Sequence, residues 1–139
     1  MKIKQEIKDL VSEFEMFDDI MDRYEYIIEL GKALKPLELR YKTEIYRVQG
    51  CQSLLWLHAY VKNGKLYLNA DGDALIVRGL VGILIRIYST RDIDDILETK
   101  ISDLEVLGLS EIISSGRQNG IASMLKIIYE SAKDFKNVK

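Results

Sequence analysis

Apolar residues at helical spacing mark both ends of the chain. The first amphipathic stripe comprises Ile3, Ile7, Leu10, Val11 and Phe14. We expect a second helix from about Asp19, ended by Gly31 in the left-handed conformation that glycine adopts easily. The stripe of the last helix comprises Ile121, Met124, Leu125, Ile128 and Ala132. The residues after Ala132 are polar, and we expect them to fray.

Between residues 44 and 71 the pattern changes to the period of two that β-strands show. Asn63-Gly64 is a favoured sequence for a type I′ hairpin turn. Counting outward from this turn, the apolar pairs are Val61 with Leu66, Ala59 with Leu68 and Leu57 with Ala70. The pairs on the opposite face, which can meet water, are Tyr60 with Tyr67, His58 with Asn69 and Trp56 with Asp71. With a further strand at Tyr46 and Val48, the hairpin predicts a three-stranded antiparallel meander.

The segment from Ala74 to Tyr88 is apolar nearly all round. It is too short and too charged to span a membrane, which takes roughly 20 apolar residues. We therefore expect a buried helix with Asp73 as its N-cap. Arg78 lies inside this helix and needs a partner, because burying an unpaired guanidinium is costly. Asp71, Asp73 or a partner protein could supply it.

Short helices are expected near Asp92–Glu98 and Asp103–Leu107, the second of them ended by Gly108. Gly79 and Gly82 would let the preceding helix approach a neighbour closely, since glycine has no Cβ. The order of helices, a three-stranded antiparallel meander and further helices predicts an α+β fold.

The chain of 139 residues has no linker, repeat or low-complexity run, so we expect one domain over 1–139, with its core at about 3–132 and a polar tail at 133–139. Lys and Arg number 20 against 22 Asp and Glu, leaving a formal charge of −2. This balance argues against binding to nucleic acid or an anionic membrane through bulk charge. The first residues contain no apolar secretory segment, so we expect a cytoplasmic, thiol-reducing setting.

Cys51 is the only cysteine, which excludes an intrachain disulfide and an all-thiolate metal site. It follows Gly50 in a loop between two predicted strands, where a sharp bend is expected. A lone cysteine often serves as a small buried hydrophobe, and this alternative stays open on the residues alone. His58 is the only histidine, and seven residues of extended chain place it roughly 20 Å away. A Cys–His nucleophilic pair is therefore not expected, and His58 is interpreted as a residue of the sheet face.

The stretch from Ser114 to Gly120 opens the last helix. Backbone N–H groups there, together with Arg117, would make a local anion site. It lacks the glycines and lysine of a phosphate-binding loop, so no nucleotide motif is met. The sequence Asp71-Gly72-Asp73 begins like a calcium loop but runs into an apolar helix, and we interpret it as capping.

Four sequence blocks, taken together, resemble the SufE family, the sulfur-acceptor partners of group II cysteine desulfurases in iron–sulfur cluster assembly. They are Arg23-Tyr24-x-Tyr-Ile-Ile-Glu-Leu-Gly31, Val48-Gln-Gly-Cys-Gln-Ser-x-x-Trp56, Asp71-Gly-Asp-Ala-x-Ile-Val-Arg-Gly-Leu80 and Arg117-x-Asn-Gly120. They span about residues 20–130 in the family's order. Two departures are Gly72, where the family commonly has Ser, and Gly116, where Pro is common. The first departure is expected to loosen the turn before Asp73.

The resemblance implies a compact α+β fold shared with U-type cluster scaffolds. It implies that Cys51 takes a persulfide sulfur from a PLP-dependent, SufS-like cysteine desulfurase, stimulates that enzyme, and passes the sulfur to a SufBCD-like scaffold complex. In the resting fold, Cys51 is expected to tuck into an apolar cavity and to swing out on docking. The residues that would frame this cavity or the partner surface are Gly50, Gln52, Ser53, Asp73, Arg78, Arg117, Asn119 and Gly120.

Several alternatives remain at this point. A U-type scaffold that holds the cluster itself fails, because such a scaffold needs three cysteines and this chain has one. An acyl-transfer enzyme would use Cys51 as nucleophile, but no base is placed for it. A non-catalytic interaction module would keep Cys51 for packing alone. No cofactor, metal or nucleotide is implied, and both a monomer and a weak homodimer fit the charge.

Overall fold

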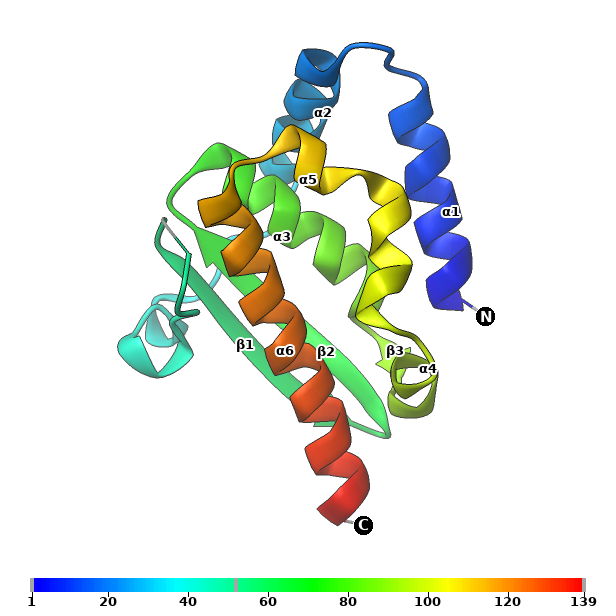
Figure 1. The fold of residues 1–139 in the computed structure, drawn as a ribbon. Coiled ribbons are helices and arrows are strands. Elements are labelled where there is room, and N and C mark those ends of the chain that lie inside the picture. Colours follow the sequence, from blue (N-terminus) through cyan, green and yellow to red (C-terminus); the bar gives the residue numbers. More distant parts are fainter. Residues whose placement is uncertain (1, 52, 139) are drawn as a thin grey trace.

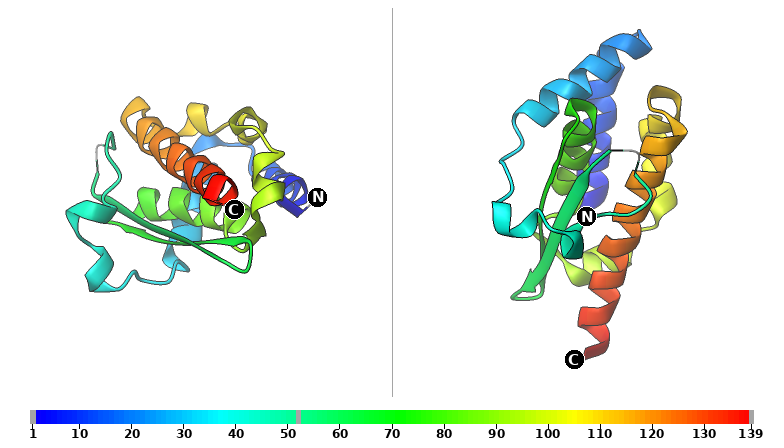
Figure 2. Two further views of the ribbon diagram at one scale, coloured as in Figure 1. Left: turned by 90° about the horizontal axis from the view of Figure 1, so that it is seen from below. Right: turned by 90° about the vertical axis from the view of Figure 1, so that its left-hand side faces the viewer.

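The computed structural model describes residues 2–51 and 53–138. Its helices and strands are, in chain order, α1 (Lys2–Glu15), α2 (Ile20–Lys32), η1 (Leu39–Tyr41), η2 (Glu44–Tyr46), β1 (Leu55–Lys62), β2 (Lys65–Gly72), α3 (Leu75–Tyr88), β3 (Arg91–Asp92), α4 (Ile93–Leu97), η3 (Ile101–Leu107), α5 (Leu109–Ile112) and α6 (Ser115–Val138). The α+β class is confirmed. Helices α3 and α6 lie on one face of the sheet, and the segment that contains η1 and η2 lies on the other (Figures 1 and 2).

The hairpin of β1 and β2 has the predicted turn and register. Asn63 and Gly64 both have positive φ, 54° and 75°, as a type I′ turn requires. All six predicted cross-strand pairs occur, from Val61 opposite Leu66 to Trp56 opposite Asp71.

The third strand differs from the prediction, although the sheet has three antiparallel strands. It is β3, which pairs with the start of β2 after α3 has crossed the sheet. The predicted strand at Tyr46 and Val48 does not form, because η2 turns the chain there and leaves one isolated bridge, between Arg47 and Trp56.

Helices α2 and α3 pack with their backbones nearly in contact. A Cβ on Gly79 would overlap the carbonyl oxygen of Ile27, and a Cβ on Gly31 would lie 2.5 Å from the Gly79 nitrogen. Gly31 lies inside α2 and lets this helix pack closely on α3. The prediction that Gly31 ends the helix is therefore wrong. The helix continues to Lys32, with Ala33 as its C-cap in a right-handed conformation.

The ends of two further elements also differ from the prediction. Asp73 does not cap α3, because the N-cap is Ala74 and the Asp73 carboxylate instead accepts a hydrogen bond from the Leu54 N–H. Helix α6 does not fray after Ala132 but continues to Val138. Its last turns are held by an ion pair between Lys136 and Asp94 and by packing of Phe135 against the core.

The part of the chain that the structure describes contains no group of three or more potential metal-binding side chains. Among the same residues, no helix has the length and apolar character needed to cross a bilayer.

Candidate functional site

Hydrogen bonds before and after Cys51 hold the loop that carries it. The Val48 N–H donates to the Leu55 carbonyl at 2.8 Å. Leu54 and Asp73 are joined twice: the Leu54 N–H donates to the Asp73 carboxylate at 3.0 Å, and the Asp73 N–H donates to the Leu54 carbonyl at 3.2 Å. The thiol therefore sits on a short loop tied to the edge strand and to the start of α3.

Gly50 makes the predicted sharp bend before Cys51. Its φ of 85° lies in the left-handed region that side chains with a Cβ rarely adopt. A Cβ added there would also lie 3.2 Å from the hydroxyl of Ser123 on α6. Glycine is thus needed for both backbone conformation and space.

The Cys51 side chain is half-buried against α6, where Gly120 makes room for it. A Cβ on Gly120 would lie only 2.7 Å from the Cys51 sulfur and 2.9 Å from the Cys51 Cβ. Around the thiol is a small cavity whose apolar lining is Leu55, Val77, Leu80, Val81, Ile121 and Met124. The fold brings these residues together from β1, α3 and α6.

Arg117 is the one charged side chain among the described residues that line this cavity. Its Nε atom is buried and has no hydrogen-bond partner among the residues that the structure describes. Buried guanidinium N–H groups normally have acceptors, so an unpaired one in the wall of this cavity is unusual.

The other predicted site residues lie at different places. Ser53 lies half-buried in the bend after Cys51, and Asp73 anchors that bend. Asn119 is exposed on α6 and does not line the cavity. Gln52 lies outside the described residues.

Arg78 does not reach the cavity and serves a different purpose. Its guanidinium donates to the Asp71 carboxylate at 2.6 Å and to the Leu34 carbonyl at 2.8 Å. Asp71 is only 2% exposed and also accepts from the N–H groups of Leu37 and Gly72. Burial alone would raise the pKa of Asp71, but these N–H groups, with Lys42 and Arg78, lower it. Of the partners considered for Arg78, Asp71 is the one found.

Gly72 lies in a tightly packed turn beside this network. A Cβ there would lie 2.7 Å from Cγ1 of Val77 and 3.2 Å from the Leu54 carbonyl oxygen. Glycine lets β2 and α3 approach each other closely at this point, and the looser turn stays a prediction.

His58 lies on the outer face of the sheet in a stack of aromatic rings. Its ring centroid is 3.9 Å from that of Tyr41 and 5.3 Å from that of Tyr60, and both pairs are stacked. Burial, with a smaller contribution from Arg40, lowers the pKa of His58. This face does not simply meet water, because η1 and η2 cover part of it.

The comparisons with known proteins bear on the family and the fold. The model of the SufE family, described as an Fe–S metabolism associated domain, matches residues 8–132. The chain belongs to the SufE family. An uncharacterized SufE-like protein of Rhizobium etli is 40% identical over 129 residues, covering 89% of this chain and 87% of that protein. The cysteine desulfuration protein SufE of Wigglesworthia glossinidia brevipalpis is 27% identical over 125 residues, covering 88% and 87%.

Two further similarities extend the SufE comparison. SufE-like protein 1 of Arabidopsis thaliana, named chloroplastic/mitochondrial, is 29% identical over 132 residues, which are 94% of this chain and 36% of that protein. The solution structure of a hypothetical protein from Thermus thermophilus superposes with a TM-score of 0.75 at 21% identity, covering 93% of this chain and 94% of the other. The similarity to the Thermus thermophilus structure shows that the two chains share a fold.

In this SufE-family chain, sequence reasoning named the thiol and its polar neighbours but missed the apolar lining of its cavity. Val77, Leu80 and Val81 were expected only as parts of a buried helix. Their spacing of three and four residues does place them on one helix face, but nothing in the sequence shows that this face meets Cys51.

Proposed function

We propose that this chain is a sulfur carrier of iron–sulfur cluster assembly that uses Cys51 as its acceptor. The sulfur comes from a PLP-dependent, SufS-like cysteine desulfurase and goes to a SufBCD-like scaffold complex. The observation that carries the proposal is the contact between the Cys51 sulfur and Gly120, in a loop that α6 and β1 hold against an apolar cavity. Family membership supports a role in Fe–S metabolism.

The transfer step is a thiol exchange. The Cys51 thiolate attacks the outer sulfur of the donor's cysteine persulfide, a new S–S bond forms at Cys51, and the old S–S bond breaks. The donor cysteine leaves as a thiolate and takes up the proton that Cys51 has lost. The reaction exchanges one persulfide for another, so it needs no oxidant or reductant.

Two features of the site serve this step. The apolar cavity shelters a thiol or persulfide from oxidants between transfers, and Cys51 must leave the cavity to reach the donor. Arg117 supplies positive charge beside the sulfur, which favours the anionic forms on both sides of the exchange. The chain places no histidine beside Cys51 as a base, so the free chain does not activate its own thiol. Docking on the desulfurase therefore switches the reaction on. A lone reactive thiol fits a thiol-reducing cytoplasm.

The alternative is an interaction module of the same fold in which Cys51 only packs. The two are separated by measuring how fast a cognate desulfurase consumes L-cysteine. We expect the native chain to stimulate turnover several-fold and Cys51→Ser to give no stimulation while still binding the enzyme. Stimulation by Cys51→Ser equal to that of the native chain would favour the interaction module.

A further inference from the structure

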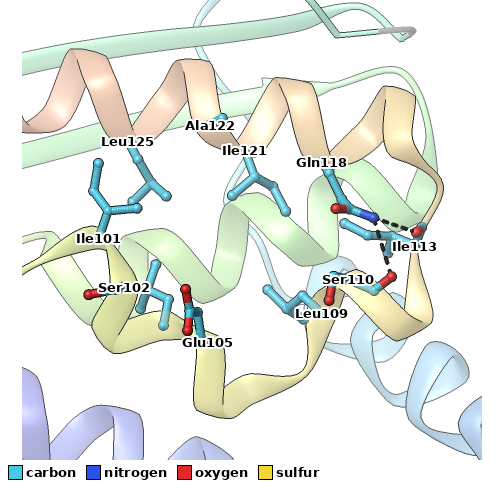
Figure 3. Close-up of a pocket in the computed structure, with 11 residues that line it drawn as sticks. Ile101, Ser102, Glu105, Leu109, Ser110, Ile113, Gln118, Ile121, Ala122 and Leu125 are labelled. Carbon is cyan, nitrogen blue, oxygen red and sulfur yellow. Dashed lines mark hydrogen bonds between the residues drawn. The ribbon is translucent and has the colours of Figure 1, made fainter.

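A second cavity adjoins the one that holds Cys51, on a neighbouring face of α6. It is a groove of about 460 Å³ between α6 and the segment formed by η3 and α5 (Figure 3). Its lining residues on α6 are Gln118, Ile121, Ala122 and Leu125, and those on the facing wall include Ile101, Leu104 and Leu109. The groove is therefore apolar along most of its length.

The groove is already formed in the folded chain. The Gln118 side-chain amide donates hydrogen bonds to the carbonyls of Ser110 and Ile113, which ties the start of α6 to the end of α5 (Figure 3). One wall is shared with the cysteine site, because Ile121 lines both the groove and the Cys51 cavity. A molecule bound in the groove would lie beside the reactive thiol without covering it.

Charge and shape limit what can bind there. Glu105 is the only charged side chain among the described residues that line the groove, and it forms no ion pair within that part of the chain. The walls are helical and use their backbone hydrogen bonds internally, so no strand edge is available to pair with an extended peptide. From Gln118 to Leu125 the groove follows α6 for about 10 Å, at 1.5 Å per residue.

We infer that this groove binds an amphipathic helix of a partner protein. Two turns of such a helix would place apolar side chains at positions i, i+4 and i+7 between Ile121 and Leu109. A lysine or arginine beside this apolar edge would pair with Glu105. The inference does not depend on sulfur transfer by Cys51.

The test is binding of a designed helical peptide of about 15 residues, long enough to be partly helical alone. It carries leucines at i, i+4 and i+7, a lysine one turn away and a fluorescent label, and binding is followed by fluorescence polarisation. We expect saturable binding, and about two- to fivefold weaker binding when the peptide lysine becomes glutamate, as for a partly exposed ion pair.

Variants of the chain locate the site. Glu105→Lys is expected to weaken binding about two- to fivefold. Glu130→Lys makes the same charge change at an exposed position of α6 that does not line the groove, and it should leave the affinity unchanged. Ala122→Phe fills the groove and should abolish binding, whereas Ala122→Ser should retain it. Circular dichroism and thermal unfolding confirm that each variant is folded.

Three results would overturn the inference: no saturable binding of the lysine peptide, equal loss of affinity in Glu105→Lys and Glu130→Lys, or native affinity in Ala122→Phe. Sulfur acceptance by Cys51 is measured separately in the same variants, so failure of the groove and failure of the proposed carrier function are distinguished.

Discussion

At the scale of single residues, the site depends on the missing side chain of Gly120. The Cys51 sulfur occupies the space that a Cβ at position 120 would take. Glycine costs a helix interior about 1 kcal/mol relative to alanine, so α6 gives up stability to hold the thiol in its cavity. This links one position of the last helix directly to the placement of the Cys51 thiol.

Gly120→Ala is therefore expected to expel the thiol from its cavity. The added methyl group would overlap Cys51, and we expect alkylation of the native protein by iodoacetamide to rise about tenfold, equivalent to about 1.4 kcal/mol in the opening equilibrium. Gly82→Ala is the matched control, since a Cβ there meets only the Leu30 carbonyl oxygen, at 3.8 Å. Equal alkylation rates in the two variants would contradict the sheltered resting state.

At the scale of elements, buried Asp71 joins the end of β2 to α3 and to the segment after α2. Its partners are Arg78 at 2.6 Å, Lys42 at 3.2 Å and two backbone N–H groups. Arg78 in turn donates to the carbonyl of Leu34. The network fixes the segment that leads toward Cys51 and so gives Arg78 a structural role, while its place at a partner surface stays a prediction.

Removing the Asp71 carboxylate should be costly. We expect Asp71→Ala to lower the free energy of unfolding by about 3 kcal/mol, because it leaves a partly buried guanidinium without its carboxylate. Asp94→Ala removes an exposed ion pair with Lys136 and should cost less than about 1 kcal/mol. Urea denaturation of both variants measures the difference, and similar losses would mean that the Asp71 network contributes little.

The aromatic stack on the outer sheet face predicts a pH dependence. Burial lowers the pKa of His58, so below about pH 6.5 the unfolded chain binds a proton more readily than the folded chain. The free energy of unfolding should therefore fall as the pH drops from about 7.5 to 5.5. His58→Phe keeps a ring in the stack and should flatten this dependence, since the chain has no other histidine. Identical pH profiles of the two proteins by urea denaturation would refute this.

At the scale of the whole molecule, we expect a fixed frame to carry a thiol that can move locally. Helices α2 and α3 meet through Gly31 and Gly79, and the hairpin packs on α3, whereas Cys51 is held by one loop and a small contact on α6. Local opening of such a segment needs less free energy than global unfolding. Release of the sulfur should leave the frame intact.

This division can be measured through the urea dependence of Cys51 alkylation. Opening of the loop exposes little surface, so the alkylation rate should stay nearly constant at low urea and rise only as global unfolding begins. The Cys51→Ser variant contains no thiol, so it gives the background rate of alkylation. A rate that climbs steeply from the lowest urea concentrations would mean that the thiol reacts only through global unfolding.

Much of this architecture could be predicted from the sequence, where local rules decide it. The hairpin followed from Asn63-Gly64 and the alternation around it, and the bend before Cys51 followed from Gly50. Long-range contacts could not be predicted in the same way. Gly31 has the sequence of a helix end but is needed for packing on Gly79, and Asp73 precedes a helix but bonds to Leu54.

The most direct test of the account is the mass of the intact protein after incubation with a cognate cysteine desulfurase and L-cysteine, without reductant. We predict a gain of one or more sulfur atoms that a thiol reductant removes and that Cys51→Ser does not show. An unchanged mass of the native chain, with the desulfurase active, would contradict the proposal that Cys51 is a sulfur acceptor and would leave it as a packing residue of the SufE fold.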